Sequence, residues 1–351
     1  MKKIDIKNKT ILVTGAAGFI ASHLIEKLCT NKDIKVIGID KLEDYYDIDL
    51  KEYNSEYDLK EYRLNKIKKY NNFTFIKCNI LDKELLNKIF KDNNPNIVIN
   101  LAAQVSARYS IDNPDAYIET NIVGFYNILE TCKNYNVEHL IYASSSSVYG
   151  TNKKTPYSEE DIVDTPVSLY AATKKSNELM AHTYSKIYKL PTTGLRFFTV
   201  YGPYGRPDMA YFRFTNKLLK NEKIKIYNYG KCKRDFTYID DIVEGIYRVI
   251  QKTSSEDIPY NIYNIGNSNP ESLLDFVNTL QEELVKQKVL PKDYDFESRK
   301  ELVPMQPGDV ETTYADTSKL EKDYNFKPTT KLKDGISKFV EWYKEYYIDK
   351  K

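Results

Sequence analysis

The chain has 351 residues, and although 29% of them are charged, the formal net charge is only +2. This balance gives no overall field that would favour nucleic acid or an anionic membrane surface. The 4 cysteines have no CxxC spacing, so we expect no metal site and no disulfide framework.

The length of the chain indicates how large a core it can form. The absence of long apolar runs indicates the compartment in which it works. A chain of this length is sufficient for one large α/β core with a smaller lobe. The opening segment MKKIDIKNKT has no apolar run of signal-peptide length, and no later segment is as long as a membrane span. We therefore expect a cytoplasmic protein with neither a membrane nor a nucleic-acid partner.

The first element in chain order is a short apolar strand, Thr10 to Thr14, followed by a glycine-rich turn. From residue 15 the chain reads GAAGFIASHL and turns into a helix. Gly15 permits a tight turn, and Gly18 allows a pyrophosphate to approach the backbone. The helix start at Phe19 and Ile20 offers free amides to an anion. This strand–turn–helix context predicts a dinucleotide-binding motif.

A second strand, Lys35 to Ile39, ends on Asp40. The Asp40 carboxylate is placed to accept hydrogen bonds from the adenosine ribose, and its charge would repel a 2′-phosphate. The sequence therefore predicts NAD rather than NADP as the cofactor, a preference that the adjacent Lys41 weakens.

Three further apolar runs of buried-strand type cover residues 73–77, 96–102 and 139–144, and helical patterns separate them. This alternation predicts an α/β fold, a Rossmann-type doubly wound parallel sheet with helices on both faces. The positions expected to line the adenine and ribose end of the cofactor cleft follow the third and fourth strands: Asn79, Ile80, Ala102 and Ala103.

Two helices in this half carry apolar stripes. One stripe consists of Ile118, Ile122, Phe125, Leu129 and Cys132, and the other of Ala172, Met180, Tyr184 and Ile187. We expect both stripes to belong to the core of one chain. We also expect the two helices to pair across a twofold axis in a homodimer.

Residues 142–175 combine a serine run that contains Ser145 with the pair Tyr170 and Lys174. On a helix, this pair falls one turn apart on one face. Tyrosine has a pKa of about 10 and is a poor base at neutral pH, but a neighbouring ammonium lowers that pKa. In a chain with 31 tyrosines a YxxxK pattern alone arises by chance, whereas here it follows the glycine turn and the serine run. The pattern predicts a general base for a sugar hydroxyl.

The regular β–α alternation ends near residue 195, where Gly/Pro-rich loops begin. We predict a smaller C-terminal substrate-binding lobe formed by residues 196–234 and 266–351. Residues 1–195 would form the NAD-binding domain, with residues 235–265 returning to it.

The motifs that follow are specific when they are taken together. They are GIDKLEDYYD (38–47), LAAQVSARYS (101–110), SSSSVYG (144–150), LYAATKK (169–175), LRFFTVYGPYGRPDMA (195–210), RDFTYIDDIVEG (234–245) and PMQPGDV (304–310). With them, the chain resembles the extended short-chain dehydrogenases/reductases of the nucleotide-sugar epimerase group. Within that group it closely resembles the UDP-glucuronate 4-epimerases.

The resemblance implies roles for individual residues. Tyr170 matches the base of the family, Lys174 its partner, and Ser145 the residue that hydrogen-bonds the sugar 4-oxygen. Arg234 and Asp309 match positions that hold the nucleotide diphosphate and ribose. The other positions implied to contact the sugar or the phosphates are Arg108, Asn121, Ser146, Ser147, Thr199 and Arg206. The chain departs from the usual family pattern at Ala21, Asn79 and Ser106-Ala107.

The implied activity is reversible C4 epimerisation of UDP-glucuronate to UDP-galacturonate, through a 4-keto sugar and with tightly bound NAD. Similar dehydratases carry Asp-Glu after the serine, and similar decarboxylases carry a glutamate, whereas this chain has Ser146 and Ser147. The alternatives are a UDP-glucose or UDP-N-acetylglucosamine 4-epimerase, or a nucleotide-sugar dehydratase or decarboxylase. A non-catalytic NAD-binding regulator would be expected to lack the Tyr–Lys pair.

Overall fold

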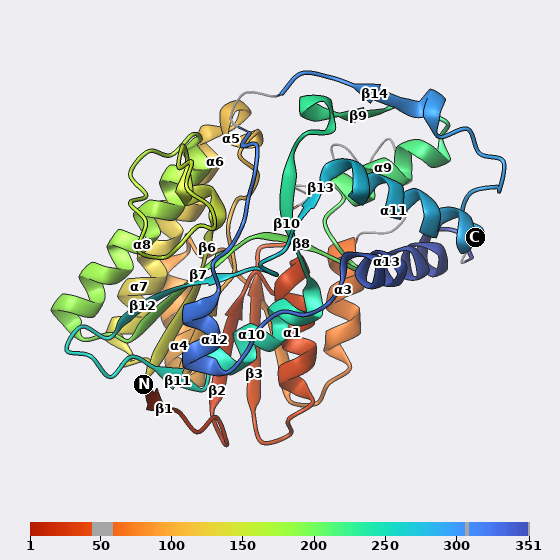
Figure 1. Ribbon diagram of the computed structural model, residues 1–351. Coiled ribbons are helices and arrows are strands. Elements are labelled where there is room, and N and C mark those ends of the chain that lie inside the picture. The colour runs from red at the N-terminus through yellow and green to blue at the C-terminus, as the bar shows by residue number, and fades with distance from the viewer. Residues whose placement is uncertain (44–58, 306–308, 350–351) are drawn as a thin grey trace.

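A seven-stranded parallel sheet forms the centre of the molecule (Figure 1). The computed structural model describes residues 1–43, 59–305 and 309–349, so the motifs at 38–47 and 304–310 lie partly outside the described residues. The strand order is β12-β7-β6-β5-β2-β3-β4. The strands are β2 (Thr10–Thr14), β3 (Lys35–Asp40), β4 (Phe73–Lys77), β5 (Ile97–Asn100), β6 (His139–Ser145), β7 (Thr192–Phe197) and β12 (Tyr260–Ile265).

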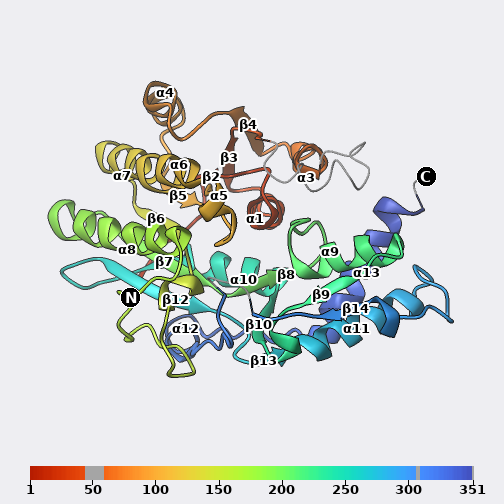
Figure 2. The ribbon, with the colours of Figure 1, turned by 90° about the horizontal axis from the view of Figure 1, so that it is seen from above.

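Helices cover both faces of this sheet (Figure 2). One layer contains α4 (Lys83–Asn93), α7 (Phe125–Asn134) and α8 (Leu169–Tyr188), and the other contains α1 (Phe19–Cys29), α3 (Leu59–Lys68) and α10 (Ile239–Val249). Successive side chains of a strand point to opposite faces, so Leu12 joins the core under the first layer, and Ile11 and Val13 join the core under the second. This architecture confirms the predicted Rossmann-type doubly wound fold.

The strand order reverses next to β2, which pairs with β3 on one side and β5 on the other. In a doubly wound sheet, ligands bind outside the carboxyl ends of the strands at this switch point. The fold alone therefore points to the region above Gly15 and Leu101.

A smaller lobe follows β7 (Figure 1). A three-stranded sheet joins β8 (Thr199–Tyr201), β10 (Lys233–Tyr238) and β13 (Pro270–Ser272), while β9 (Ile224–Ile226) pairs with β14 (Lys300–Leu302). Its helices are α9 (Ala210–Leu219), α11 (Leu273–Lys286) and α13 (Leu332–Tyr347).

The strand pairing differs from the predicted domain limits at two places, the end of β7 and strand β10. Strand β7 runs to Phe197 and thus passes the predicted limit at residue 195, and β12 pairs with β7 in the central sheet. Strand β10 pairs instead with β8 and β13 in the lobe. The division into two domains stays a prediction.

The remaining elements are short. They are β1 (Lys2–Lys3), which pairs with β11 (Lys252–Thr253), α5 (Tyr109–Asp112), α6 (Pro114–Tyr117), the π-helical turn η1 (Ile118–Gly124), η2 (Ser146–Tyr149), η3 (Tyr227–Gly230), η4 (Glu297–Arg299) and α12 (Ser318–Tyr324). None of the helices in the described part of the chain is long and apolar enough to cross a membrane.

One apolar core extends from the sheet into the lobe. Residues of β2 and α1 share this cluster of buried side chains with Phe212 of α9, Phe276 of α11 and Phe339 of α13. The ring of Phe236 in β10 stacks on Phe276 at a centroid distance of 4.6 Å. The sheet and the lobe are thus joined by continuous packing.

The two predicted stripes are partly wrong. Phe125, Leu129 and Cys132 are buried as expected, but Ile118 is 43% exposed and Ile187 is 61% exposed. The inner side of α8 instead carries small and polar side chains, because it faces the cavity described below and the buried guanidinium of Arg196. The spacing of apolar residues along α8 could not predict that its inner side faces polar groups.

Candidate active site

The carboxyl ends of the central strands open into one large cavity of about 860 Å³. It brings together segments from both halves of the chain, from the glycine turn to Asp309. The predicted site residues that line it are Gly15, Gly18, Phe19, Ile20, Asp40, Asn79, Ile80, Ala102, Ala103, Arg108, Ser145, Ser146, Ser147, Tyr170, Lys174, Thr199, Arg206 and Asp309. Their contacts with a ligand stay predictions.

Two predicted residues lie elsewhere. Asn121 is 2% exposed and lies behind the cavity wall, where its side chain bonds both backbone groups of Gln104 (2.8 and 2.9 Å) and donates to Thr173 Oγ1 (3.0 Å). It therefore holds the segment after β5 against α8, and the implied sugar contact is not what this position provides. Arg234 lines a smaller cavity of about 170 Å³ that shares Asp309 with the first, and its Nη2 donates to Asp309 Oδ1 (2.6 Å).

The glycine turn fits the diphosphate of a dinucleotide. Gly15 has φ +71°, and a Cβ there would lie 3.0 Å from the backbone nitrogen of Ala102, so a side chain would press on the backbone that follows β5. Gly18 precedes α1 without a side-chain cap, which leaves the amides of the first helical turn for an anion. The turn thus has the close approach and the donors that the sequence predicted.

Asp40 is buried at the end of β3. Its Oδ2 accepts the amide of Ala17 (3.1 Å) and its Oδ1 accepts the amide of Leu42 (2.7 Å). Each carboxylate oxygen can accept a second hydrogen bond, so the ribose contact predicted for Asp40 is compatible with these bonds. They also fix the carboxylate to the glycine turn.

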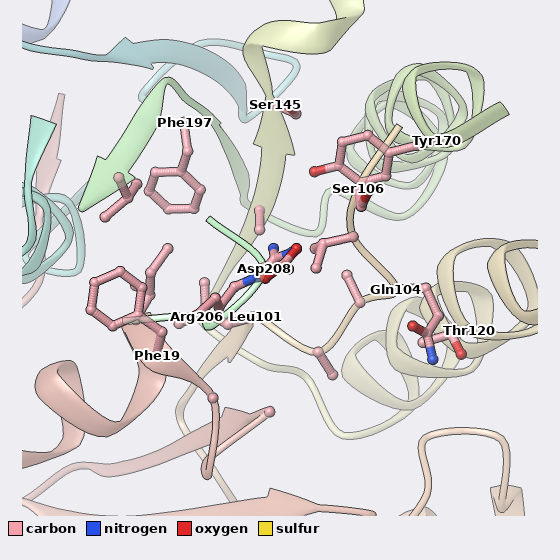
Figure 3. A pocket seen from close by; sticks show the side chains of 18 of the residues that line it. Phe19, Leu101, Gln104, Ser106, Thr120, Ser145, Tyr170, Phe197, Arg206 and Asp208 are labelled. Carbon is pink, nitrogen blue, oxygen red and sulfur yellow. Dashed lines mark hydrogen bonds and ion pairs between the residues drawn. The ribbon is translucent and has the colours of Figure 1, made fainter. Parts of the chain in front are cut away.

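The predicted catalytic group gathers at the start of α8 and the end of β6 (Figure 3). The Ser168 side chain caps α8 by accepting the amide of Ala171 (3.1 Å), so Tyr170 and Lys174 both fall in the first two turns. Ser145 Oγ donates to Ser147 Oγ (3.1 Å) and caps η2 by accepting the amide of Ser147 (3.1 Å), and this hydroxyl acts to lower the pKa of Tyr170. The serine run therefore places its second hydroxyl, that of Ser145, beside the tyrosine.

The pKa values of Tyr170 and Lys174 differ from those expected for a tyrosine base beside an ammonium. Burial raises the pKa of Tyr170, while the Ser145 hydrogen bond and the Arg206 charge act in the opposite direction. Lys174 donates to the carbonyl of Ala143 (2.8 Å), and burial lowers its pKa to about 7. Lys174 Nζ also lies 6.0 Å from the ring centroid of Tyr170, but burial dominates the pKa of Tyr170, so the predicted lowering of that pKa by Lys174 is not seen.

The opposite wall of the cavity carries an ion pair. Arg206 Nε donates to Asp208 Oδ1 (3.0 Å) and its Nη2 to Asp208 Oδ2 (2.5 Å), and Figure 3 shows the two side chains together. Asp208 was not among the predicted site residues, although it lies two residues after Arg206, an expected anion ligand. Asp208 orients the guanidinium before any anion arrives.

A buried network under the catalytic helix was also missed. Arg196 of β7 donates to both carboxylate oxygens of Glu178 in α8 (2.8 and 2.9 Å), and Ser144 Oγ donates to the same carboxylate (2.7 Å). Burial acts to raise the pKa of Glu178, but the hydrogen bonds and charge of Arg196 outweigh it and lower that pKa. The network fixes α8, the helix that carries Tyr170, to β6 and β7.

Fold and cavity together define an enzyme that uses a bound dinucleotide to act on a second ligand in the same cavity. Residues 12–339 match the family model described as GDP-mannose 4,6 dehydratase. The chain belongs to this family of extended short-chain dehydrogenases/reductases, as its sequence motifs predicted.

Similar proteins cover nearly the whole chain. Protein CapI of Staphylococcus aureus is 51% identical, covering 96% of this chain and 99% of its own. UDP-glucuronate 4-epimerase 4 of Arabidopsis thaliana is 43% identical, covering 97% of this chain and 77% of its own. The crystal structure of a Bacillus cereus UDP-glucuronic acid 4-epimerase with UDP-glucuronic acid and NAD aligns with a TM-score of 0.84 and 33% identity, covering 96% and 100% of the two chains.

Proposed function

We propose that the protein is an NAD-dependent UDP-sugar 4-epimerase whose substrate is UDP-glucuronate, which it converts reversibly to UDP-galacturonate. One observation carries this proposal: Tyr170, the serine run and Arg206 line the same cavity as the glycine turn. A base for the C4 hydroxyl and groups for a carboxylate thus lie within reach of a dinucleotide.

Tyr170 and Ser145 have different roles in the proposed epimerisation at C4. Tyr170 takes the proton of the sugar C4 hydroxyl, and Ser145 holds the C4 oxygen by a hydrogen bond. Gly15, Gly18 and Asp40 would hold NAD⁺, which would supply the acceptor for the C4 hydride and the donor for its return. Rotation of the 4-keto sugar between the two transfers inverts C4, and Tyr170 gives its proton back to the new hydroxyl. The buried Glu178 network keeps the base in place throughout.

The carboxylate of the sugar is what distinguishes this substrate. Oxidation at C4 makes the intermediate a β-keto acid, which loses CO₂ when its carboxylate aligns perpendicular to the ketone plane. Ser146, Ser147 and Thr199 line the cavity and can donate hydrogen bonds that hold the carboxylate away from this orientation. Arg206 adds a charge-assisted hydrogen bond.

The substrate proposal makes the first prediction. Incubating the purified protein with UDP-glucuronate should yield UDP-galacturonate as the main product, with the carboxylate intact, as resolved by anion-exchange chromatography and NMR. A clear preference for UDP-glucose or UDP-N-acetylglucosamine would contradict the substrate assignment. UDP-pentose as the main product would contradict the role of the serine run.

We further propose that the protein is a homodimer that pairs through η1, α7 and α8. The supporting observation is that these neighbouring helices expose large apolar side chains, from 39% for Tyr126 to 61% for Ile187. The others are Ile118, Val123, Leu179 and Tyr188. Two copies of such a face related by a twofold axis would bury one another's apolar stripe.

The dimer proposal makes the second prediction. Replacing Leu179, which is 57% exposed, with glutamate should convert the dimer to a monomer in analytical ultracentrifugation, because two carboxylates would meet near the twofold axis. The matched control is Ile162→Glu, since Ile162 is 74% exposed and lies outside these helices. A wild-type protein that sediments as a monomer would contradict the proposal.

A further inference from the structure

Arg63 is a charged side chain with only 1% of its surface exposed, and it lies between two segments that line the cavity. It extends from α3, which packs beside α1 (Figure 1). Burying a guanidinium is unfavourable unless its donors find acceptors. The identity of those acceptors is therefore informative.

Among the described residues, backbone carbonyls of two separate segments accept hydrogen bonds from Arg63. Nε and Nη2 both donate to the carbonyl of Tyr204 (2.9 and 2.6 Å), and Nη2 also donates to the carbonyl of Gly205 (3.0 Å). Nη1 donates to the carbonyl of Ala17 (3.3 Å). One guanidinium thus joins the glycine turn to the residues immediately before Arg206.

The segment before Arg206 needs such support. Tyr204 has φ +56°, a left-handed conformation that is unfavourable for a tyrosine. A Cβ at Gly205 would lie 1.8 Å from the hydroxyl of Tyr211, so the backbone of Gly205 is tightly confined. A small displacement of these two residues would move Arg206 and its partner Asp208 in the cavity wall.

We propose that Arg63 is a positioning residue that couples the two halves of the cavity. It holds residues 204–208 on the glycine turn, so that the turn that receives the cofactor also fixes the side chains that receive the nucleotide sugar. Arg63 itself does not line the cavity. This inference rests on the proposed function, because it takes Arg206 to contact the second ligand.

Arginine is required for this role because its donors point in several directions within one rigid plane. A lysine at this position would keep the positive charge but would offer one ammonium, which cannot reach both the turn and residues 204–205 with the same geometry. The substitution Arg63→Lys therefore separates the bridging geometry from the charge.

The protein contains a fluorescent reporter for the hydrogen bonds that Arg63 makes to residues 204–205. Trp342 is the 1 tryptophan of the chain, and the ring of Tyr204 lies 5.0 Å from its ring. Release of residues 204–205 should therefore alter the fluorescence emission of Trp342.

The test compares the NAD-loaded wild type with Arg63→Lys and with the matched control Arg248→Lys. Arg248 in α10 also donates to a carbonyl of a separate segment, that of Asn325 (2.7 Å), but it does not line the cavity or touch its wall. UDP affinity is measured by calorimetry, NAD affinity by release during dialysis, and the emission of Trp342 by fluorescence.

We expect Arg63→Lys to weaken UDP binding by about tenfold, to release NAD faster and to shift the Trp342 emission, since losing a bridging charged hydrogen bond has about that effect. Arg248→Lys should change only the melting temperature. UDP affinity and emission equal to those of the wild type in Arg63→Lys would overturn the proposal.

Two controls keep the outcomes separate. If the wild type binds NAD but not UDP, the proposed function fails, and the NAD release and Trp342 emission of Arg63→Lys still decide the role of Arg63. If Arg63→Lys does not fold, hydrogen exchange of the wild type decides. NAD should then slow the exchange of the amides of Tyr204, Gly205, Arg206 and Asp208, and an unchanged rate would overturn the proposal.

Discussion

Replacing Tyr170 with phenylalanine should lower turnover by about 10²- to 10⁴-fold, the usual contribution of a general acid–base group. Only the phenolic oxygen is lost, and the ring keeps its edge-to-face contact with Tyr117 at a centroid distance of 6.1 Å. UDP and NAD should therefore bind as they do to the wild type. Turnover with UDP-glucuronate and the binding of UDP are measured separately.

The control for this prediction is Tyr135→Phe. The Tyr135 hydroxyl donates to the carbonyl of Asn87 (3.1 Å), outside the cavity, so its loss should leave turnover unchanged. Near-normal turnover in Tyr170→Phe would place the base elsewhere.

Because burial raises the pKa of Tyr170, wild-type turnover should increase with pH as the base loses its proton. The remaining turnover of Tyr170→Phe should not increase with pH.

Replacing Glu178 with glutamine should destabilise the protein by about 3–5 kcal/mol, because the substitution leaves the guanidinium of Arg196 buried without its charge partner. The side chains of Arg196 and Glu178 are only 4% and 1% exposed. The free energy of unfolding is measured by urea denaturation. Since the fold holds Tyr170 through this helix, turnover should fall as well.

The matched control is the exposed pair of Lys88 and Asp92, whose side chains are 70% and 51% exposed. Asp92→Asn should change stability by at most about 0.5 kcal/mol.

The pKa of Glu178 is lowered from its usual value of 4.5. The stabilisation by the buried pair is therefore present above pH 4.5 and is lost as the pH falls through the folded-state pKa. A loss below about 1 kcal/mol in Glu178→Gln would contradict the assigned role.

The sequence predicted the fold well where the signal was local. Strands such as Ile97–Asn100 are buried on both faces of a parallel sheet, so they appear as continuous apolar runs. The glycine turn was equally visible, because Gly15 must adopt a positive φ next to a strand end. Residue type and spacing are sufficient for such features.

The parts of the site that the sequence did not predict depend on tertiary neighbours. Glu178 and Arg196 lie in consecutive elements, and only the packing of α8 against β7 brings their side chains together. Asn121 was assigned to the sugar from a motif, but only the folded chain reveals that Gln104 and Thr173 occupy its side chain. The pKa of Tyr170 could not be predicted either, because burial outweighs the nearby charges.

The apolar core that extends from β2 and α1 into α9, α11 and α13 limits how the cavity can admit its ligands. Hinge opening of the lobe as a rigid body would expose buried rings such as Phe212, Phe276 and Phe339 to water. Large hydrophobic interfaces of this kind suppress relative domain motion. Substrate entry and product exit therefore need a route that leaves this shared core closed to water.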